Sequence, residues 1–202
     1  MEKATVVRPG KFSVNVAADS RRDEFDVKNE ILVTNKVPVD FVFIGDSITH
    51  NWELNAYFGR TEKTVINRGI GGDKTEYLLK RFEADVIQLK PEYAVIKIGI
   101  NDTWVLDDYP LNEKDLPDKI LVKVIKNIEE IIRICRQHNQ KAALCSILPV
   151  NIPPHIPGHL TNTIRNDLIL KINEQIKEVT QNSGNVYIDY HSRLVKADGK
   201  TL

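Results

Sequence analysis

From residue 39 onward the sequence alternates between two kinds of segment, and this alternation constrains the fold more than any other feature. Short runs rich in apolar and β-branched residues occupy 39–45, 63–69, 93–99, 141–149 and 185–189. The stretches between them carry apolar residues at helical spacing. The clearest stripe consists of Ile120, Leu121, Val124, Ile125, Ile128, Ile131, Ile132 and Cys135. Strands joined through helices form a parallel sheet, so we expect an α/β fold with five parallel strands.

Residues 1–38 do not join this alternation. The segments 11–17 and 30–34 are interpreted either as edge strands or as part of an extension packed on the domain, and both interpretations stay open. A chain of 202 residues is typical of a single domain. We therefore expect an N-terminal extension over 1–38 and one domain over 39–202.

The overall composition excludes several classes of partner. Lys and Arg together number 28, as do Asp and Glu, so no bulk charge attracts nucleic acid or an anionic membrane. No apolar run is long enough to span a bilayer, and the N-terminus lacks the apolar segment of a signal peptide. We expect a cytoplasmic protein. The two cysteines, Cys135 and Cys145, are interpreted as buried reduced thiols, with a catalytic thiol as the alternative.

Ligands of open parallel sheets bind beyond the carboxyl ends of the strands, so the residues after each strand carry the functional prediction. After the first strand, residues 45–49 read GDSIT. A serine at a strand-to-helix turn is exposed beside free backbone N–H groups, which suits Ser47 as a nucleophile. The alternative is an ordinary Asp or Ser helix cap.

After the second strand, residues 67–75 read NRGIGGDKT. Glycines allow backbone N–H groups to approach a ligand closely. The segment matches neither the Walker phosphate-binding pattern nor the dinucleotide fingerprint, which weakens nucleotide or flavin binding as a function. A plain tight turn is the alternative.

After the third strand, Asn101 offers a neutral amide donor within GIND at 99–102. Such a donor stabilises a developing oxyanion without protonating it, although an Asx turn is the alternative. Together the three segments fit acyl transfer, with Ser47 as nucleophile and N–H donors from Ser47, Gly72 and Asn101. Trp104 and Tyr109, in the following loop, are expected either to line a substrate pocket or to pack the loop.

These three blocks, with SILPVN at 146–151, resemble those of the SGNH hydrolase superfamily, the GDSL esterases and lipases. The resemblance covers roughly residues 39–190 and implies a flavodoxin-like three-layer α/β/α fold. It implies that Ser47 is the nucleophile, that Gly72 is the backbone oxyanion donor and that Asn101 is the side-chain donor. It also implies a small-molecule ester as substrate (an acyl ester, a lysophospholipid or an acetylated sugar) and no metal or other cofactor.

The family's last block, Asp-x-x-His, supplies the general base, and no Asp-x-x-His occurs in these residues. The expected explanation is that the C-terminal end of the domain is missing, which would leave little activity and an uncovered sheet face that favours a homo-oligomer. Replacement of the base by His50, His155, His159 or His191 remains an alternative, whereas His138 is expected to be structural, at a helix C-terminus. A glycan- or lipid-binding protein without turnover is the rival function.

Overall fold

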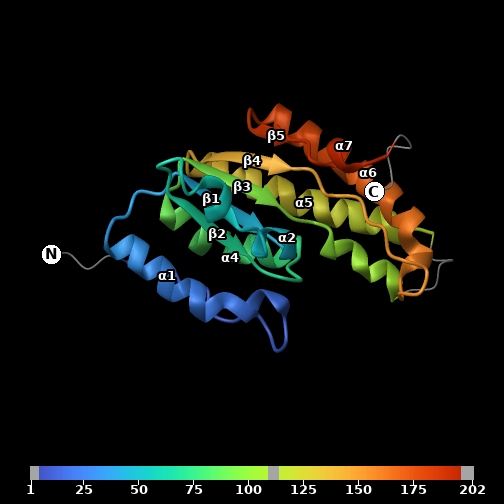
Figure 1. Cartoon of the computed structure of the whole chain (residues 1–202), viewed down its shortest axis with the longest axis horizontal. Coiled ribbons are helices and arrows are strands. Elements are labelled where there is room, and N and C mark those ends of the chain that lie inside the picture. The colour runs from blue at the N-terminus through green and yellow to red at the C-terminus, as the bar shows by residue number, and fades with distance from the viewer. Residues whose placement is uncertain (1–4, 109–113, 197–202) are drawn as a thin grey trace.

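The computed structural model describes residues 5–108 and 114–196 and contains a five-stranded parallel sheet in the order β2-β1-β3-β4-β5 (Figure 1). The strands are β1 (Phe41–Gly45), β2 (Val65–Gly69), β3 (Tyr93–Lys97), β4 (Lys141–Cys145) and β5 (Val186–Ile188). Each predicted run contains one strand, and every neighbouring pair is parallel. The expected α/β class is confirmed.

The connecting helices differ greatly in length. The α-helices are α1 (Arg22–Thr34), α2 (Ser47–His50), α3 (Leu54–Phe58), α4 (Thr75–Asp85), α5 (Leu116–Gln137), α6 (Asn162–Asn182) and α7 (His191–Leu194). Short 3₁₀ helices occur at η1 (Ala17–Arg21), η2 (Ile87–Leu89), η3 (Asn101–Asp107) and η4 (His159–Thr161). The predicted apolar stripe lies on α5, which has a proline in its first turn. No helix within the described residues is long and apolar enough to cross a membrane.

The strand order explains which face each helix covers. Three crossovers, from β2 to β3, from β3 to β4 and from β4 to β5, all move across the sheet in the same direction. Because such connections are right-handed, they place α4, α5 and α6 on the same face. These helices and that sheet face form the main hydrophobic core, which contains Val42, Ile44, Ala94, Ile96, Leu144 and Ile128. The crossover from β1 to β2 runs the opposite way and carries only the short helices α2 and α3 to the other face. The second helical layer is therefore thin.

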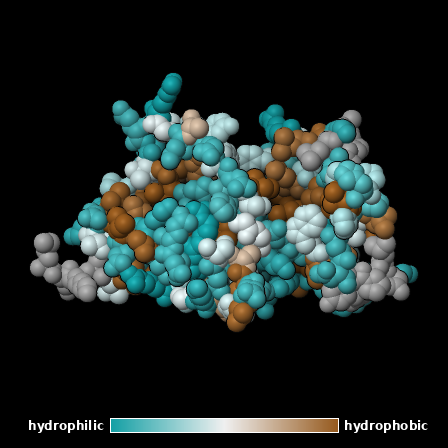
Figure 2. All heavy atoms as spheres, turned by 60° about the horizontal axis from the view of Figure 1, so that its bottom comes forward, coloured by the Kyte–Doolittle hydropathy of each residue, from teal (hydrophilic) through white to brown (hydrophobic). Residues whose placement is uncertain are grey.

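The smaller core on that second face contains Phe43, Leu54, Val95, Ala143 and Cys145. Half-buried aromatic residues pack around it, among them Phe41, Trp52, Phe58 and Tyr190. Trp52 and Tyr190 meet edge to face with ring centroids 6.3 Å apart. In the space-filling view, apolar surface gathers in separate areas between hydrophilic side chains (Figure 2).

Residues 17–34 are helical, and the edge-strand interpretation is wrong, because residues 30–34 lie inside α1 and residues 11–17 form no strand. Helix α1 runs along the β2 side of the molecule (Figure 1) and contacts α4. Arg22 donates a 2.6 Å hydrogen bond to Asp85 of α4, and the Asn29 amide donates to the same carboxylate at 2.9 Å. Phe25 is fully buried beneath the side chains of three arginines. The two hydrogen bonds to Asp85 join residues more than fifty positions apart, so local spacing does not reveal them.

Candidate active site

Ser47 is the first residue of α2 and follows β1 through a single residue, Asp46. The Asp46 carboxylate caps the helix by accepting a 2.9 Å hydrogen bond from the Ile48 N–H. Because this cap is fully buried, burial raises the pKa of Asp46, and the positive charge of Lys97 opposes that shift. Ser47 itself is half-buried at the carboxyl edge of the sheet. The predicted helix cap is thus present, but Asp46 provides it and leaves the Ser47 hydroxyl without a capping role.

The glycine-rich loop after β2 packs directly on α2. A Cβ at Gly69 would lie 2.1 Å from the backbone nitrogen of His50, so only glycine allows this approach. The Gly71 N–H donates a 3.1 Å hydrogen bond to Nδ1 of His50, and a Cβ at Gly71 would stand 3.9 Å from that of Ser47. Gly72 has a φ of +78°, a left-handed conformation that favours glycine. The loop predicted to supply an oxyanion donor therefore lies beside Ser47.

Asn101 begins η3, and both ends of its amide are engaged. Its Nδ2 donates to the Asp73 carbonyl at 2.9 Å, and its Oδ1 accepts from Nε1 of Trp104 at 3.0 Å. An asparagine amide has two N–H groups, so one remains for a ligand. Trp104 also stacks on Arg165 at 4.2 Å, which favours its loop-packing role over a pocket-lining one. Tyr109 lies outside the described residues.

A second contact joins the glycine-rich loop to the segment after β3. Asp102, buried next to Asn101, accepts hydrogen bonds from the Thr75 backbone N–H at 3.0 Å and from its hydroxyl at 2.7 Å. The Asn127 amide of α5 donates to the same hydroxyl at 2.8 Å. The two predicted segments are therefore held in a fixed relation.

A buried arginine that local patterns did not reveal holds the carboxyl edge of the sheet together. Arg81 of α4 is fully buried and donates to the carbonyls of Gly45 and Arg68, at the ends of β1 and β2. It also contacts the carboxylates of Asp73 and Asp85, each at 2.8 Å. In the sequence Arg81 resembles any solvated helix residue, and only its buried acidic partners, brought close by folding, reveal its role.

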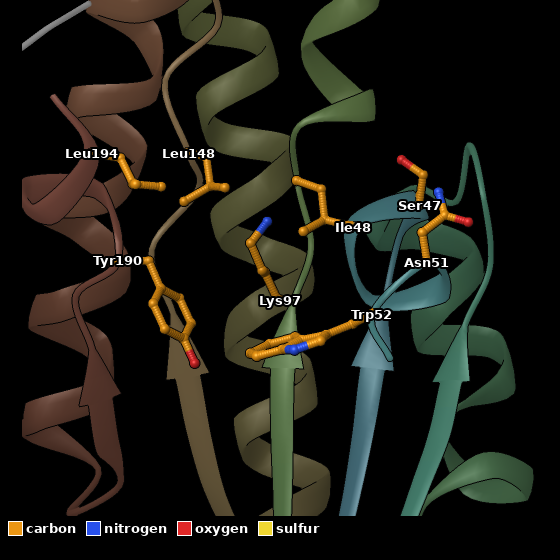
Figure 3. Close-up of a pocket in the computed structure, with 8 residues that line it drawn as sticks. All are labelled: Ser47, Ile48, Asn51, Trp52, Lys97, Leu148, Tyr190 and Leu194. Atoms are coloured by element: carbon orange, nitrogen blue, oxygen red, sulfur yellow. The ribbon is translucent and has the colours of Figure 1, made fainter. Parts of the chain in front are cut away.

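A pocket of about 500 Å³ opens beside Ser47 (Figure 3). Its lining residues come from the ends of four strands and the segments after them: Ser47, Ile48, Asn51, Trp52, Lys97, Leu148, Tyr190 and Leu194. The pocket extends from β1 across β3 and β4 toward β5, away from β2 and its glycine-rich loop. Gly72 and Asn101 do not line it.

None of the five histidines, all within the described residues, is hydrogen-bonded to Ser47. His50 lies on the same short helix as Ser47, but its Nδ1 accepts the Gly71 N–H, and burial followed by the charge of Arg21 lowers its pKa. His191, on α7, is buried with no hydrogen-bond partner for Nε2. His155 and His159 lie in the segment between β4 and α6, where His159 begins η4, and neither lines the pocket. His138 caps the C-terminus of α5, as expected.

The described residues contain no group of three or more His, Cys, Asp or Glu side chains that could hold a metal ion. Both cysteines are free and buried. Burial raises the pKa of each thiol to about 12. The interpretation of Cys135 and Cys145 as buried reduced thiols is confirmed.

A family model, the GDSL-like Lipase/Acylhydrolase family, matches residues 43–202. The chain belongs to this family. The uncharacterized lipoprotein YqeF of Bacillus subtilis is 30% identical over 125 residues, which are 55% of this chain and 49% of YqeF. An acetylxylan esterase of Geobacillus stearothermophilus is 42% identical over 57 residues, 28% of this chain and 26% of the esterase. The chain thus spans about half the length of YqeF and about a quarter of the length of the esterase.

Solved structures of the same family share the fold. The crystal structure of a GDSL-like lipase from Bacteroides thetaiotaomicron superposes with a TM-score of 0.70 at 24% identity, covering 88% of this chain and 82% of the lipase. The family match confirms the expected SGNH superfamily membership, and the shared structure confirms the expected fold.

Proposed function

We propose that the chain is a serine ester hydrolase with Ser47 as its nucleophile. The observation that carries the proposal is the position of Ser47: its hydroxyl is not used for capping, and the glycine-rich loop and the Asn101 segment are locked together beside it. Membership of an acylhydrolase family supports the same reaction.

In this mechanism the Ser47 Oγ attacks the ester carbonyl while a base takes the hydroxyl proton. The carbonyl oxygen becomes an oxyanion, which the Ser47 and Gly72 N–H groups and the free amide N–H of Asn101 stabilise. The tetrahedral intermediate collapses, the C–O bond to the alcohol breaks, and the proton passes to the departing alkoxide. Water then attacks the acyl-enzyme and releases the carboxylic acid and free Ser47.

The substrate class proposed is a small acyl ester, a lysophospholipid or an acetylated carbohydrate. The acetylxylan esterase similarity supports the last of these.

The first test is hydrolysis of nitrophenyl acetate, together with labelling by a fluorophosphonate, which reacts with activated serines. We expect Ser47→Ala to abolish both activities. Ser13→Ala is the matched control, because Ser13 is exposed in the N-terminal segment, and it should behave as the unsubstituted protein does. Equal labelling of Ser47→Ala and the unsubstituted protein would contradict the proposal.

The base is assigned by the same assay with His50→Gln, His155→Gln, His159→Gln and His191→Gln. The geometry argues against His50. Its Nδ1 accepts the Gly71 N–H, so a neutral imidazole carries its proton on Nε2, and neither nitrogen is free to take the proton of Ser47. A base supplied from outside these 202 residues leaves all four variants at the unsubstituted rate.

A glycan- or lipid-binding protein is the second candidate, favoured by the absence of a hydrogen bond between Ser47 and any histidine. Ligand binding without fluorophosphonate labelling would support it.

A further inference from the structure

Lys97 sets the pocket beside Ser47 apart from a simple apolar cleft. It is the only charged residue among the eight described residues that line the pocket, and the residue is only 5% exposed. In Figure 3 the side chain extends past the end of β3, with Ile48 and Leu148 on either side and Trp52 and Tyr190 below. The ammonium group is thus directed into the cavity.

Within the described residues, the ammonium of Lys97 has neither a hydrogen bond nor an ion pair. Asp46 is the carboxylate that acts on it electrostatically, but the two groups do not form a salt bridge. One carboxylate oxygen of Asp46 accepts from Ile48, and the other is buried without a partner, which direct contact with Lys97 would have satisfied. Burial lowers the pKa of Lys97, and the negative charge of Asp46 offsets this effect only in part. Such an unpaired buried charge in a cleft is typical of a binding group.

The rest of the pocket wall restricts what can meet this charge. Among the described residues of the wall, those other than Ser47, Asn51 and Lys97 are aliphatic or aromatic, so a fully hydrated ion would lose its water without replacement. An alkyl or aryl chain that ends in a carboxylate fits both the apolar lining and the charge of Lys97. The apolar stretch packs against Trp52 and Leu148, and the carboxylate accepts a charge-assisted hydrogen bond from Lys97.

The reaction chemistry indicates which half of an ester occupies the pocket. The acyl group stays bonded to the Ser47 Oγ through the acyl-enzyme, whereas the alcohol leaves, so a cavity that begins at Ser47 suits the acyl group. We propose, on the basis of the proposed hydrolase function, that the substrate is an ester whose acyl chain carries a second, free carboxylate bound by Lys97. Hydrolysis then releases a dicarboxylic acid.

Binding of hexanoate and of the uncharged 1-hexanol tests this proposal without requiring turnover. The two indole N–H signals in an NMR spectrum distinguish Trp52, which lines the pocket, from Trp104, which does not, and Trp104→Phe assigns them. We expect hexanoate to shift the Trp52 signal and to bind on the order of tenfold to a hundredfold more tightly than hexanol. Lys97→Met should abolish this preference, and Lys97→Arg should keep part of it.

The matched control is Lys63→Met, which removes an exposed lysine paired with Asp40 outside this pocket and should leave the preference intact. If Lys97→Met does not fold, Lys97→Gln takes its place. Equal binding of hexanoate and hexanol, no binding of hexanoate, or a preference that survives in Lys97→Met (or in Lys97→Gln, where that variant replaces it) would overturn the proposal. In that case Lys97 only balances the charge of Asp46.

The result also separates this inference from the hydrolase proposal. A Lys97-dependent preference for hexanoate, combined with no Ser47-dependent labelling or hydrolysis, retains the anion pocket and removes the serine hydrolase. Ser47-dependent hydrolysis of nitrophenyl acetate without that preference retains the serine hydrolase and removes the anion pocket.

Discussion

At the scale of single residues, the orientation of Asn101 depends on Trp104. An asparagine amide can be turned over, exchanging donor and acceptor, at little steric cost. Here the Trp104 indole N–H donates to Oδ1, which leaves Nδ2 to face the glycine-rich loop. Trp104 is therefore a positioning residue in the proposed oxyanion site.

Removing this donor should slow reaction at Ser47 without removing the amide itself. We expect Trp104→Phe to lower the rate of fluorophosphonate labelling less than Asn101→Ala, for which the loss is on the order of 10²–10³-fold. Phenylalanine keeps an aromatic ring over Arg165, so folding should be preserved. An unchanged labelling rate in Trp104→Phe would show that Asn101 is oriented without the indole.

The two thiols give a prediction about reactivity. With a pKa raised to about 12, Cys135 and Cys145 stay protonated at mildly alkaline pH, and the thiolate is the reactive form. We expect dithiobis(nitrobenzoate) to react with neither cysteine in the folded protein and with both after denaturation. Rapid reaction under native conditions would contradict the burial of at least one thiol.

At the scale of secondary-structure elements, Arg81 joins helix α4 to the ends of β1 and β2. Its guanidinium contacts two buried carboxylates and two strand-end carbonyls. Because Asp46 and the glycine-rich loop follow these strand ends directly, the position of Ser47 depends on this connection.

We expect Arg81→Met to lower the free energy of unfolding by about 3–5 kcal/mol, because it leaves Asp73 and Asp85 with fewer buried partners. Urea unfolding monitored by circular dichroism measures the change. The control is Arg133→Met on α5, where an exposed pair with Glu130 is lost and the free energy should stay the same within error. Similar effects of the two substitutions would mean that the buried network contributes little.

At the scale of the whole molecule, the two sheet faces are covered unequally. Within the described residues, three long helices pack on one face, whereas the short helices α2 and α3 leave a second cavity of about 480 Å³ on the other. Its lining includes Phe41, Phe58, Val65 and Ile188. Apolar surface of this kind favours association, so we propose that this chain forms a homo-oligomer through this face.

Light scattering across a wide range of protein concentrations tests this proposal. We expect the mass to exceed that of one chain and Val65→Lys to return it to the monomer, because a lysine on edge strand β2 opposes close packing. Val122→Lys, on the exposed side of α5, should change nothing. A monomer at every concentration would contradict the proposal.

The periodicity of the chain was enough to predict the parallel sheet and the long helix α5, since the spacing of apolar residues is a local property. It also predicted that Ser47, the glycine-rich loop and Asn101 share one edge, because parallel strands end together. The helix α1, the Arg81 network and the unpaired Lys97 could not be predicted in this way. A charged side chain can be buried in a folded protein only where a partner of opposite charge or a ligand compensates it. Such partners, for example Arg22 and Asp85, lie far apart along the chain, and only the packed molecule brings them together.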